Sequence, residues 1–171
     1  MKIFIVSDTH GEIEKTAELI KKDKYDAIIH LGDHALDAKE LKEIFPYTPM
    51  YNVKGNCDYD YDVRESSLIQ IGGKRIFMTH GHLYRVDWGT DRLIYAAMEK
   101  AADVCLFGHT HVPLLELRDD IIFLNPGSPS RPRGGSIASY AVLTIEEKNN
   151  IKAEINCFGN GFVQTTNSIR R

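Results

Sequence analysis

Residues 3–34 read IFIVSDTHGEIEKTAELIKKDKYDAIIHLGDH, and this stretch decides the fold class. Two short apolar runs within it, Ile3–Val6 and Ala27–Leu31, are typical of buried β-strands. Between them, residues 12–22 carry apolar side chains at positions 13, 17 and 20 with charged residues in between, which predicts an amphipathic helix. A strand, a helix and a second strand in this order predict a βαβ unit with parallel strands.

The alternation continues beyond this unit and then changes character. A second helix is predicted over residues 36–45, ending before Pro46, and a third strand over Met50–Val53. The later part adds a helix at residues 91–102, a buried strand at 104–107, and three hairpins with strands at 67–71 and 75–79, 114–117 and 121–124, and 140–145 and 151–158. We therefore expect an α/β chain that ends in antiparallel β-structure, and its length of 171 residues predicts one domain over residues 1–171.

Composition narrows the class of protein. The formal net charge is -3, and a protein that grips duplex nucleic acid through its phosphates usually has a basic excess, so nucleic acid is not an expected partner. No apolar run approaches the roughly 20 residues of a membrane span, and no export signal is visible. Three widely spaced cysteines fit neither a disulfide framework nor a zinc knuckle, which predicts a cytoplasmic protein.

Polar residues follow five of the predicted strands directly. Ligands of open α/β sheets bind outside the carboxyl ends of the strands, so these residues are expected to converge. The five segments are Ser7-Asp8-Thr9-His10, Gly32-Asp33-His34, Gly55-Asn56-Cys57-Asp58, His80-Gly81-His82 and Gly108-His109-Thr110-His111.

The residue types in these segments are metal ligands. Carboxylate oxygens, imidazole nitrogens and one amide oxygen form a mixed set that suits Mn, Fe, Zn or Ni better than an all-oxygen Ca or Mg site. Seven candidate ligands are too many for one tetrahedral zinc, but they suffice for two ions if one carboxylate bridges them. A metal pair of this kind is used for in-line displacement at phosphorus.

Each segment has an ordinary alternative when it is taken alone. Asp-x-His is common, Gly-Asp is usually a turn, and Gly-Asn-x-Asp reads as a plain loop. His30 lies inside a predicted strand and is interpreted as a core residue with its hydrogen bonds satisfied. The order and placement of all five segments together favour the metal site.

With these segments and the Asn125-Pro126-Gly127-Ser128 loop, the sequence resembles the calcineurin-like metallophosphoesterases, and among them the small bacterial and archaeal phosphodiesterases. The resemblance covers nearly the whole chain. It implies a sandwich of two mixed β-sheets flanked by helices.

The resemblance also implies a role for each ligand position. One metal ion would be held by Asp8, His10 and His111. A second ion would be held by Asn56, His80 and His109. Asp33 would bridge the two, and His82 would face the phosphate, so Asp33, Asn56 and His82 are the residues expected to act in catalysis.

One position departs from the family pattern. Many members have a histidine after the Asn, where this chain has Cys57, and a neutral thiol is a poorer proton donor than an imidazolium. His34 is an alternative donor. Arg131 or Arg133 is a candidate for a phosphate contact, with a solvated loop or a subunit contact as the alternative.

These observations predict a metal-dependent phosphodiesterase that hydrolyses small phosphodiesters by attack of a hydroxide bridging two divalent ions, with Mn expected first and Ni, Fe or Zn as alternatives. A second hypothesis is a catalytically weak scaffold or protein-interaction module on the same fold, as in the retromer subunit of this family. A nuclease is a weaker third hypothesis because the net charge is negative. The sequence leaves open whether the chain forms a homo-oligomer.

Overall fold

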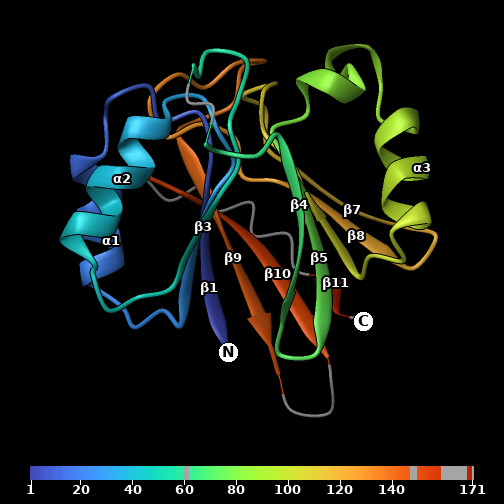
Figure 1. The fold of residues 1–171 in the computed structure, drawn as a ribbon, viewed down its shortest axis with the longest axis horizontal. Helices are drawn as coiled ribbons and strands as arrows, with labels where there is room; N and C mark the ends of the chain where they lie inside the picture. Colours follow the sequence, from blue (N-terminus) through green and yellow to red (C-terminus); the bar gives the residue numbers. More distant parts are fainter. Residues whose placement is uncertain (60–61, 147–149, 159–168, 171) are drawn as a thin grey trace.

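The structure is a computed structural model, and it describes residues 1–59, 62–146 and 150–158 together with the backbone of residues 169–170. Two β-sheets form its centre (Figure 1). The first has the order β11-β10-β9-β1-β2-β3, with β11 Ile169–Arg170, β10 Ile151–Cys157, β9 Ser139–Ile145, β1 Lys2–Val6, β2 Ala27–His30 and β3 Met50–Asn52. The second has the order β4-β5-β6-β8-β7, with β4 Ser66–Ile71, β5 Lys74–Thr79, β6 Val104–Leu106, β8 Ile121–Asn125 and β7 Leu114–Arg118.

Both sheets are mixed, as the family resemblance implies. In the first sheet β1, β2 and β3 are parallel, with Ile5 opposite Ile29, while β9 and β10 are antiparallel. In the second sheet β5, β6 and β8 are parallel, and the β4–β5 and β7–β8 pairs are the expected hairpins. The two-residue strand β11, which pairs with β10, was not predicted.

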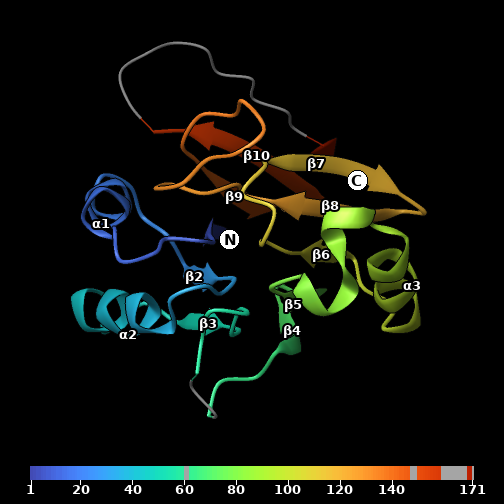
Figure 2. The ribbon, with the colours of Figure 1, turned by 90° about the horizontal axis from the view of Figure 1, so that it is seen from above.

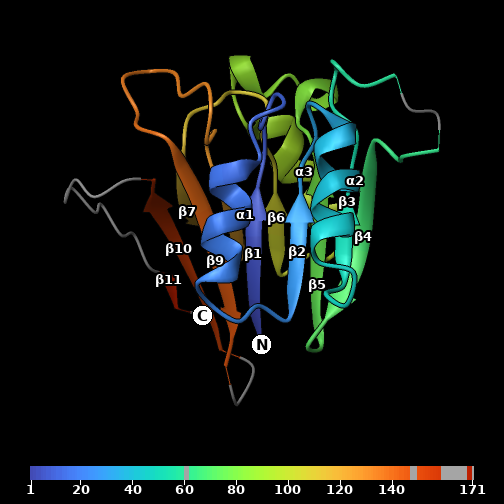
Figure 3. The same ribbon diagram turned by 90° about the vertical axis from the view of Figure 1, so that its left-hand side faces the viewer.

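The helices cover the two outer faces (Figures 2 and 3). Helices α1 Glu14–Lys21 and α2 Ala35–Ile44 pack on the first sheet through a cluster that includes Phe4, Ile20 and Leu41. Helix α3 Asp91–Glu99 packs on the second sheet. The main apolar core lies between the sheets, where alternate residues of the strands meet. None of the helices among the described residues is both long and apolar enough to span a membrane.

Helix boundaries are the least accurate part of the sequence prediction. Helix α1 is shorter at both ends than residues 12–22, and α3 ends at Glu99 rather than at residue 102. Ala101 has a φ of 46°, a left-handed conformation that cannot continue a right-handed helix. Part of the third predicted hairpin turn, residues 147–149, lies outside the described residues.

The parallel strands bring their carboxyl ends to one edge of the molecule, at the top of Figure 1. Backbone hydrogen bonds hold neighbouring strand ends together there. Leu31 N donates to Val6 O at 2.9 Å, and Asp8 N donates to Gly32 O at 3.0 Å. On the second sheet, Gly108 N donates to His80 O at 2.9 Å. The segments after β1, β2, β5 and β6 therefore share this edge.

Candidate metal centre

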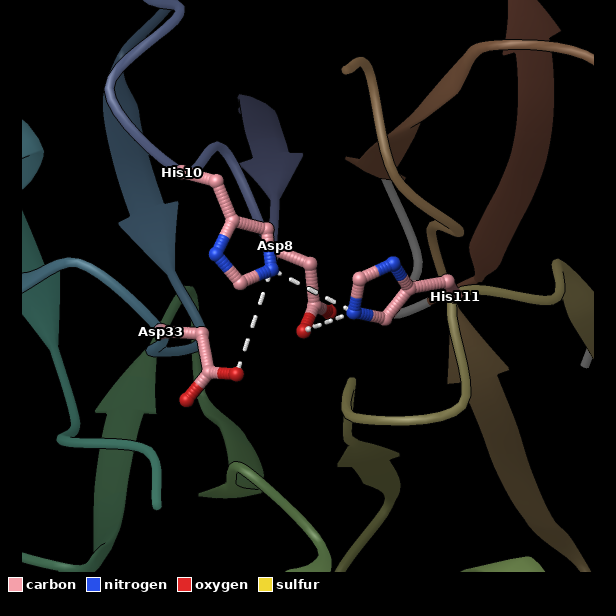
Figure 4. Close-up of side chains that lie close together, drawn as sticks. All are labelled: Asp8, His10, Asp33 and His111. Carbon is pink, nitrogen blue, oxygen red and sulfur yellow. Dashed lines mark hydrogen bonds and ion pairs between the residues drawn. The ribbon is translucent and has the colours of Figure 1, made fainter. Parts of the chain in front are cut away.

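Four of the predicted ligands form one cluster at this edge. Each offers an oxygen or a ring nitrogen, and these four atoms all lie within 4.8 Å of one another (Figure 4). The four are Asp8, His10, Asp33 and His111. They come from the ends of β1, β2 and β6, so the cluster joins the two sheets.

The contacts of Asp8 and His111 fix their orientation. Asp8 is fully buried, and its Oδ2 accepts a hydrogen bond from His109 N at 3.1 Å. Its Oδ1 lies 3.2 Å from His111 Nε2. The other ring nitrogen of His111, Nδ1, donates to Arg131 O at 2.6 Å. Because this bond requires a proton on Nδ1, Nε2 is the nitrogen that the neutral ring offers to a metal.

A similar arrangement connects Asp33 and His80. Asp33 Oδ1 accepts a hydrogen bond from Cys57 N at 3.0 Å and lies 3.3 Å from His80 Nε2. The ring of His80 is fully buried, and its Nδ1 donates to Leu31 O at 2.8 Å. Nε2 of His80 therefore points into the cluster and is available as a ligand.

Besides Ser7 Oγ and Thr16 Oγ1, three buried polar atoms, all of residues predicted for the site, have no hydrogen-bond partner among the described residues. They are Asp8 Oδ1, His80 Nε2 and His82 Nδ1. An unsatisfied buried polar atom costs about 1–3 kcal/mol, so native structures keep few of them. Two of these three belong to predicted ligands, and a cation accepts lone pairs from both a carboxylate oxygen and a neutral imidazole. The residues present fit a divalent metal ion.

Electrostatic coupling inside the cluster is strong. Burial opposes ionisation of Asp33, but contact with His80 and the Cys57 N–H outweighs it, so the pKa of Asp33 lies well below its usual value. Burial likewise opposes the charge on His80, but the two carboxylates raise the pKa of His80. Contact with Asp8 raises the pKa of His111. The carboxylates are thus ionised and attract positive charge to this point.

His109 is held by a residue that the motifs do not contain. Its Nε2 donates to Asp87 Oδ2 at 2.6 Å, which leaves Nδ1 as the nitrogen that can bind a metal. The rings of His80 and His109 lie 5.1 Å apart, and those of His80 and His82 lie 5.5 Å apart. Sequence reasoning missed Asp87 because it lies in an unremarkable turn, 22 residues before its partner.

Asn56 lies at the exposed rim of the cluster. Its Nδ2 donates to Cys57 Sγ at 3.3 Å, and among the described residues its side chain forms no hydrogen bond with another predicted ligand. Cys57 is exposed, and burial of its sulfur together with the neighbouring Asp33 carboxylate raises the pKa of the thiol to about 11. The thiol is therefore neutral near neutral pH.

The backbone at the cluster is unusual. Five of the seven predicted metal ligands have a left-handed φ, between 47° and 70°. They are Asp8, His10, Asp33, His109 and His111. Asp and His tolerate this region better than bulky residues, and such strain concentrates at functional sites.

The Asn-Pro-Gly-Ser loop supports the cluster from below. Ser128 is buried, and its Oγ donates to the backbone oxygen of Asp8 at 2.8 Å while accepting from Arg131 N at 2.9 Å. Asn125 Nδ2 donates to Gly108 O at 2.9 Å. The loop thus fixes the backbone on both sides of the cluster.

His30 is fully buried, and its side chain forms a hydrogen bond with Thr9 Oγ1. This agrees with the interpretation of His30 as a core residue with its hydrogen bonds satisfied.

The remaining sequence candidates lie around the rim. His34 is exposed, and its Nδ1 bonds to the buried Asp37 carboxylate at 2.6 Å. Arg131 and Arg133 are exposed, but the charge of Arg131 contributes, after burial, to the lowered pKa of His10. Asp58 accepts hydrogen bonds from His34 N and Ala35 N at the start of α2 and so caps this helix.

Comparison with known proteins agrees with this geometry. Residues 1–148 match the model of the calcineurin-like phosphoesterase superfamily domain. The chain belongs to this superfamily. It is similar to the probable metallophosphoesterase YsnB of Bacillus subtilis, with 36% identity over 148 residues that cover 85% of each chain. It is also similar to the phosphodiesterase YfcE of Escherichia coli, with 32% identity over 169 residues that cover 84% of this chain and 87% of YfcE.

Solved structures show the same fold. A predicted phosphoesterase from Streptococcus pneumoniae superimposes with a TM-score of 0.82 at 32% identity, covering 99% of this chain and 97% of its own. Vps29 from Entamoeba histolytica, solved with zinc, has a TM-score of 0.78 at 21% identity, covering 100% of this chain and 98% of its own, which is a likeness of fold alone. Membership of this family supports hydrolase activity on phosphate esters and implies that divalent metal ions are bound. The cluster is a candidate site for them.

Proposed function

We propose that this chain is a metal-dependent phosphodiesterase that hydrolyses small phosphodiesters with two divalent metal ions, Mn being the first choice. The observation that carries the proposal is the buried cluster, in which unsatisfied ligand atoms from two sheets face one point. The similarity to a phosphodiesterase over most of the chain supports the choice of a diester.

The ligands divide into two sets. The first ion would be held by Asp8, His10 and His111, and the second by Asn56, His80 and His109. Asp33 would bridge them, since its Oδ2 lies 4.0 Å from His10 Nε2 and its Oδ1 lies 3.3 Å from His80 Nε2. Its two oxygens thus face one member of each set.

Bound divalent ions lower the pKa of coordinated water and draw charge from phosphate oxygens. The chain's own residues prepare the site for this chemistry. The hydrogen bonds from His80 and His111 to backbone carbonyls fix the ring orientation, so little reorganisation is needed. Arg131 would offer a positive charge to a phosphate oxygen, and His82, whose ring lies 5.5 Å from that of His80, would face the substrate.

The neutral Cys57 thiol is a weak acid, and this has a consequence for the leaving group. Protonation by a thiol with a pKa of about 11 contributes little near neutral pH. Diesters that release a phenol should therefore react faster than diesters that release an alkyl alcohol.

The test is hydrolysis of bis(p-nitrophenyl) phosphate and of p-nitrophenyl phosphate by chelator-stripped protein, with Mn, Ni, Zn or Mg added back. We expect metal-dependent cleavage, with the diester faster than the monoester. Asp33→Asn removes the bridging charge and should reduce kcat by at least about 100-fold, on the scale of losing one electrostatic group at a reacting centre. Asp119→Asn, at an exposed hairpin turn, is the matched control. Near-normal activity of Asp33→Asn would contradict the two-ion assignment.

A further inference from the structure

A hollow of about 510 Å³ lies on the connection between β5 and α3. It is formed by two short 3₁₀ turns, His82–Tyr84 and Val86–Trp88, and by the first turn of α3. Its lining residues are Tyr84, Arg85, Trp88, Gly89, Asp91 and Arg92. The volume falls within the roughly 300–1,000 Å³ of small-molecule sites.

The hollow adjoins the metal cluster through the same two turns. His82 begins the first turn, and its backbone oxygen accepts a hydrogen bond from Arg85 N at 3.0 Å. Asp87, inside the second turn, accepts the hydrogen bond from His109 Nε2. This segment therefore carries both Asp87, which holds His109, and residues that line the hollow. The hollow is thus connected to the cluster through Asp87 and Trp88, which are neighbours in the chain.

The aromatic side chains of the hollow extend from a backbone that is held in place by hydrogen bonds and packing. Trp88 is 91% exposed, although its neighbour Val86 is buried and Trp88 N donates to Arg85 O at 2.9 Å. Tyr84 is held by edge-to-face contact with Phe77, with ring centroids 6.0 Å apart. An indole held out in water exposes a large apolar face that folding does not use.

The charges of the hollow favour an anion. Arg85 and Arg92 are both exposed, and neither forms an ion pair with any residue that the structure describes. Asp91 is the acidic lining residue, and it offers hydrogen-bond acceptors for hydroxyl or amino groups. Guanidinium groups pair with phosphate in a bidentate manner, and aromatic faces stack on nucleobases.

We propose that this hollow binds a nucleoside phosphate, with the base stacked on Trp88 and the phosphate held between Arg85 and Arg92. The proposal rests on the proposed function in one respect, because it makes the preferred substrates small diesters that carry a nucleotide beside the scissile phosphate. The binding itself requires neither metal nor turnover.

Trp88 is the only tryptophan of the chain, so tryptophan fluorescence reports on the hollow directly. The experiment titrates chelator-stripped protein with AMP, adenosine, ribose 5-phosphate and inorganic phosphate, and corrects for absorption by the ligands. We expect AMP to quench the fluorescence with saturation. Adenosine and ribose 5-phosphate should each bind at least about tenfold more weakly than AMP, because each lacks one of the two interactions.

Variants separate the two interactions. Arg85→Ala and Arg92→Ala should each weaken AMP binding and leave adenosine binding unchanged, whereas Lys15→Ala, on the exposed face of α1, is the control for loss of one positive charge. Calorimetry extends the series to Trp88, where Trp88→Phe should retain AMP binding and Trp88→Ala should lose it. Quenching by AMP that equals quenching by ribose 5-phosphate would overturn the proposal, as would AMP binding that none of these substitutions weakens. If the protein binds AMP in this manner but shows no phosphodiesterase activity, the proposed function is wrong and the proposal for the hollow stands.

Discussion

Replacing Gly55 by alanine should disable the metal cluster while leaving the fold in place. A Cβ at Gly55 would lie 2.1 Å from Asp33 Oδ1 and 2.5 Å from Asp33 N. Gly55 does not have a left-handed φ, so the substitution carries no backbone penalty of that kind. The effect is therefore a collision with Asp33, at its backbone nitrogen and at the carboxylate proposed to bridge the two ions.

The size of the displacement sets the expected loss. Ordinary contact with a Cβ begins at 3.4 Å, so the carboxylate oxygen and the new methyl group must separate by more than 1 Å. This oxygen also accepts the bond from Cys57 N and faces His80. A misplacement of about 1 Å at a reacting centre costs about 100-fold in rate, and overpacking of this kind costs about 1–3 kcal/mol of stability. A domain stable by about 5–15 kcal/mol remains folded after that loss.

The assay is kcat/KM on bis(p-nitrophenyl) phosphate, together with calorimetric titration of metal into stripped protein and urea unfolding of the same samples. Gly135→Ala is the matched control, because its Cβ would meet nothing within 4 Å although its φ of 75° strains an alanine. We expect Gly135→Ala to lose stability of about 1 kcal/mol and to keep its activity and metal binding. The reasoning is refuted if Gly55→Ala is within threefold of Gly135→Ala in kcat/KM.

Two further predictions test the groups beneath and beside the cluster. Burial lowers the pKa of His30. Below about pH 6.5 this histidine therefore binds a proton in the unfolded chain but not in the folded chain. The free energy of unfolding should then fall as the pH falls, by at most about 1.4 kcal/mol per pH unit from this group. Urea unfolding between about pH 5 and 8 should show a weaker dependence in His30→Gln than in the unmodified chain, and identical slopes would contradict the assignment. Asp87→Ala removes the partner of His109 and should weaken metal binding by about 10–100-fold in calorimetry, with Asp87→Asn intermediate; unchanged binding would show that this contact does not orient a ligand.

The sequence predicts the sheets better than the helix ends. Strands β1 and β2 were recognisable because Ile3–Val6 is apolar throughout and Ala27–Leu31 is apolar except for His30, and both faces of their sheet are covered. The ends of α1 and α3 were missed because they depend on local backbone conformation, as at Ala101, and not on the apolar pattern. The two-residue β11 has no pattern of its own and exists through pairing with β10.

For the site, motif order identified residues, but it did not identify what holds them. Asp87 contacts His109 through tertiary structure, Asp37 contacts His34 within the first turn of α2, and neither carboxylate stands in a motif. The role of Asp58 as a helix cap was hidden because Gly-Asn-x-Asp reads as a loop until α2 is placed beside it. The position of Asn56 as a metal ligand stays a prediction.

The cluster takes its ligands from both sheets, and this links the site to the apolar core. Asp8 and Asp33 follow strands of the first sheet, whereas His80 and His111 follow strands of the second. The distances of 3.2 Å and 3.3 Å that join these pairs therefore depend on how the two sheets pack against each other. Protein interiors are close-packed, so the core between the sheets fixes that separation more firmly than loops would. The strained backbone of the ligands is tolerable for the same reason, because two well-packed sheets hold the strand ends from which the ligands extend.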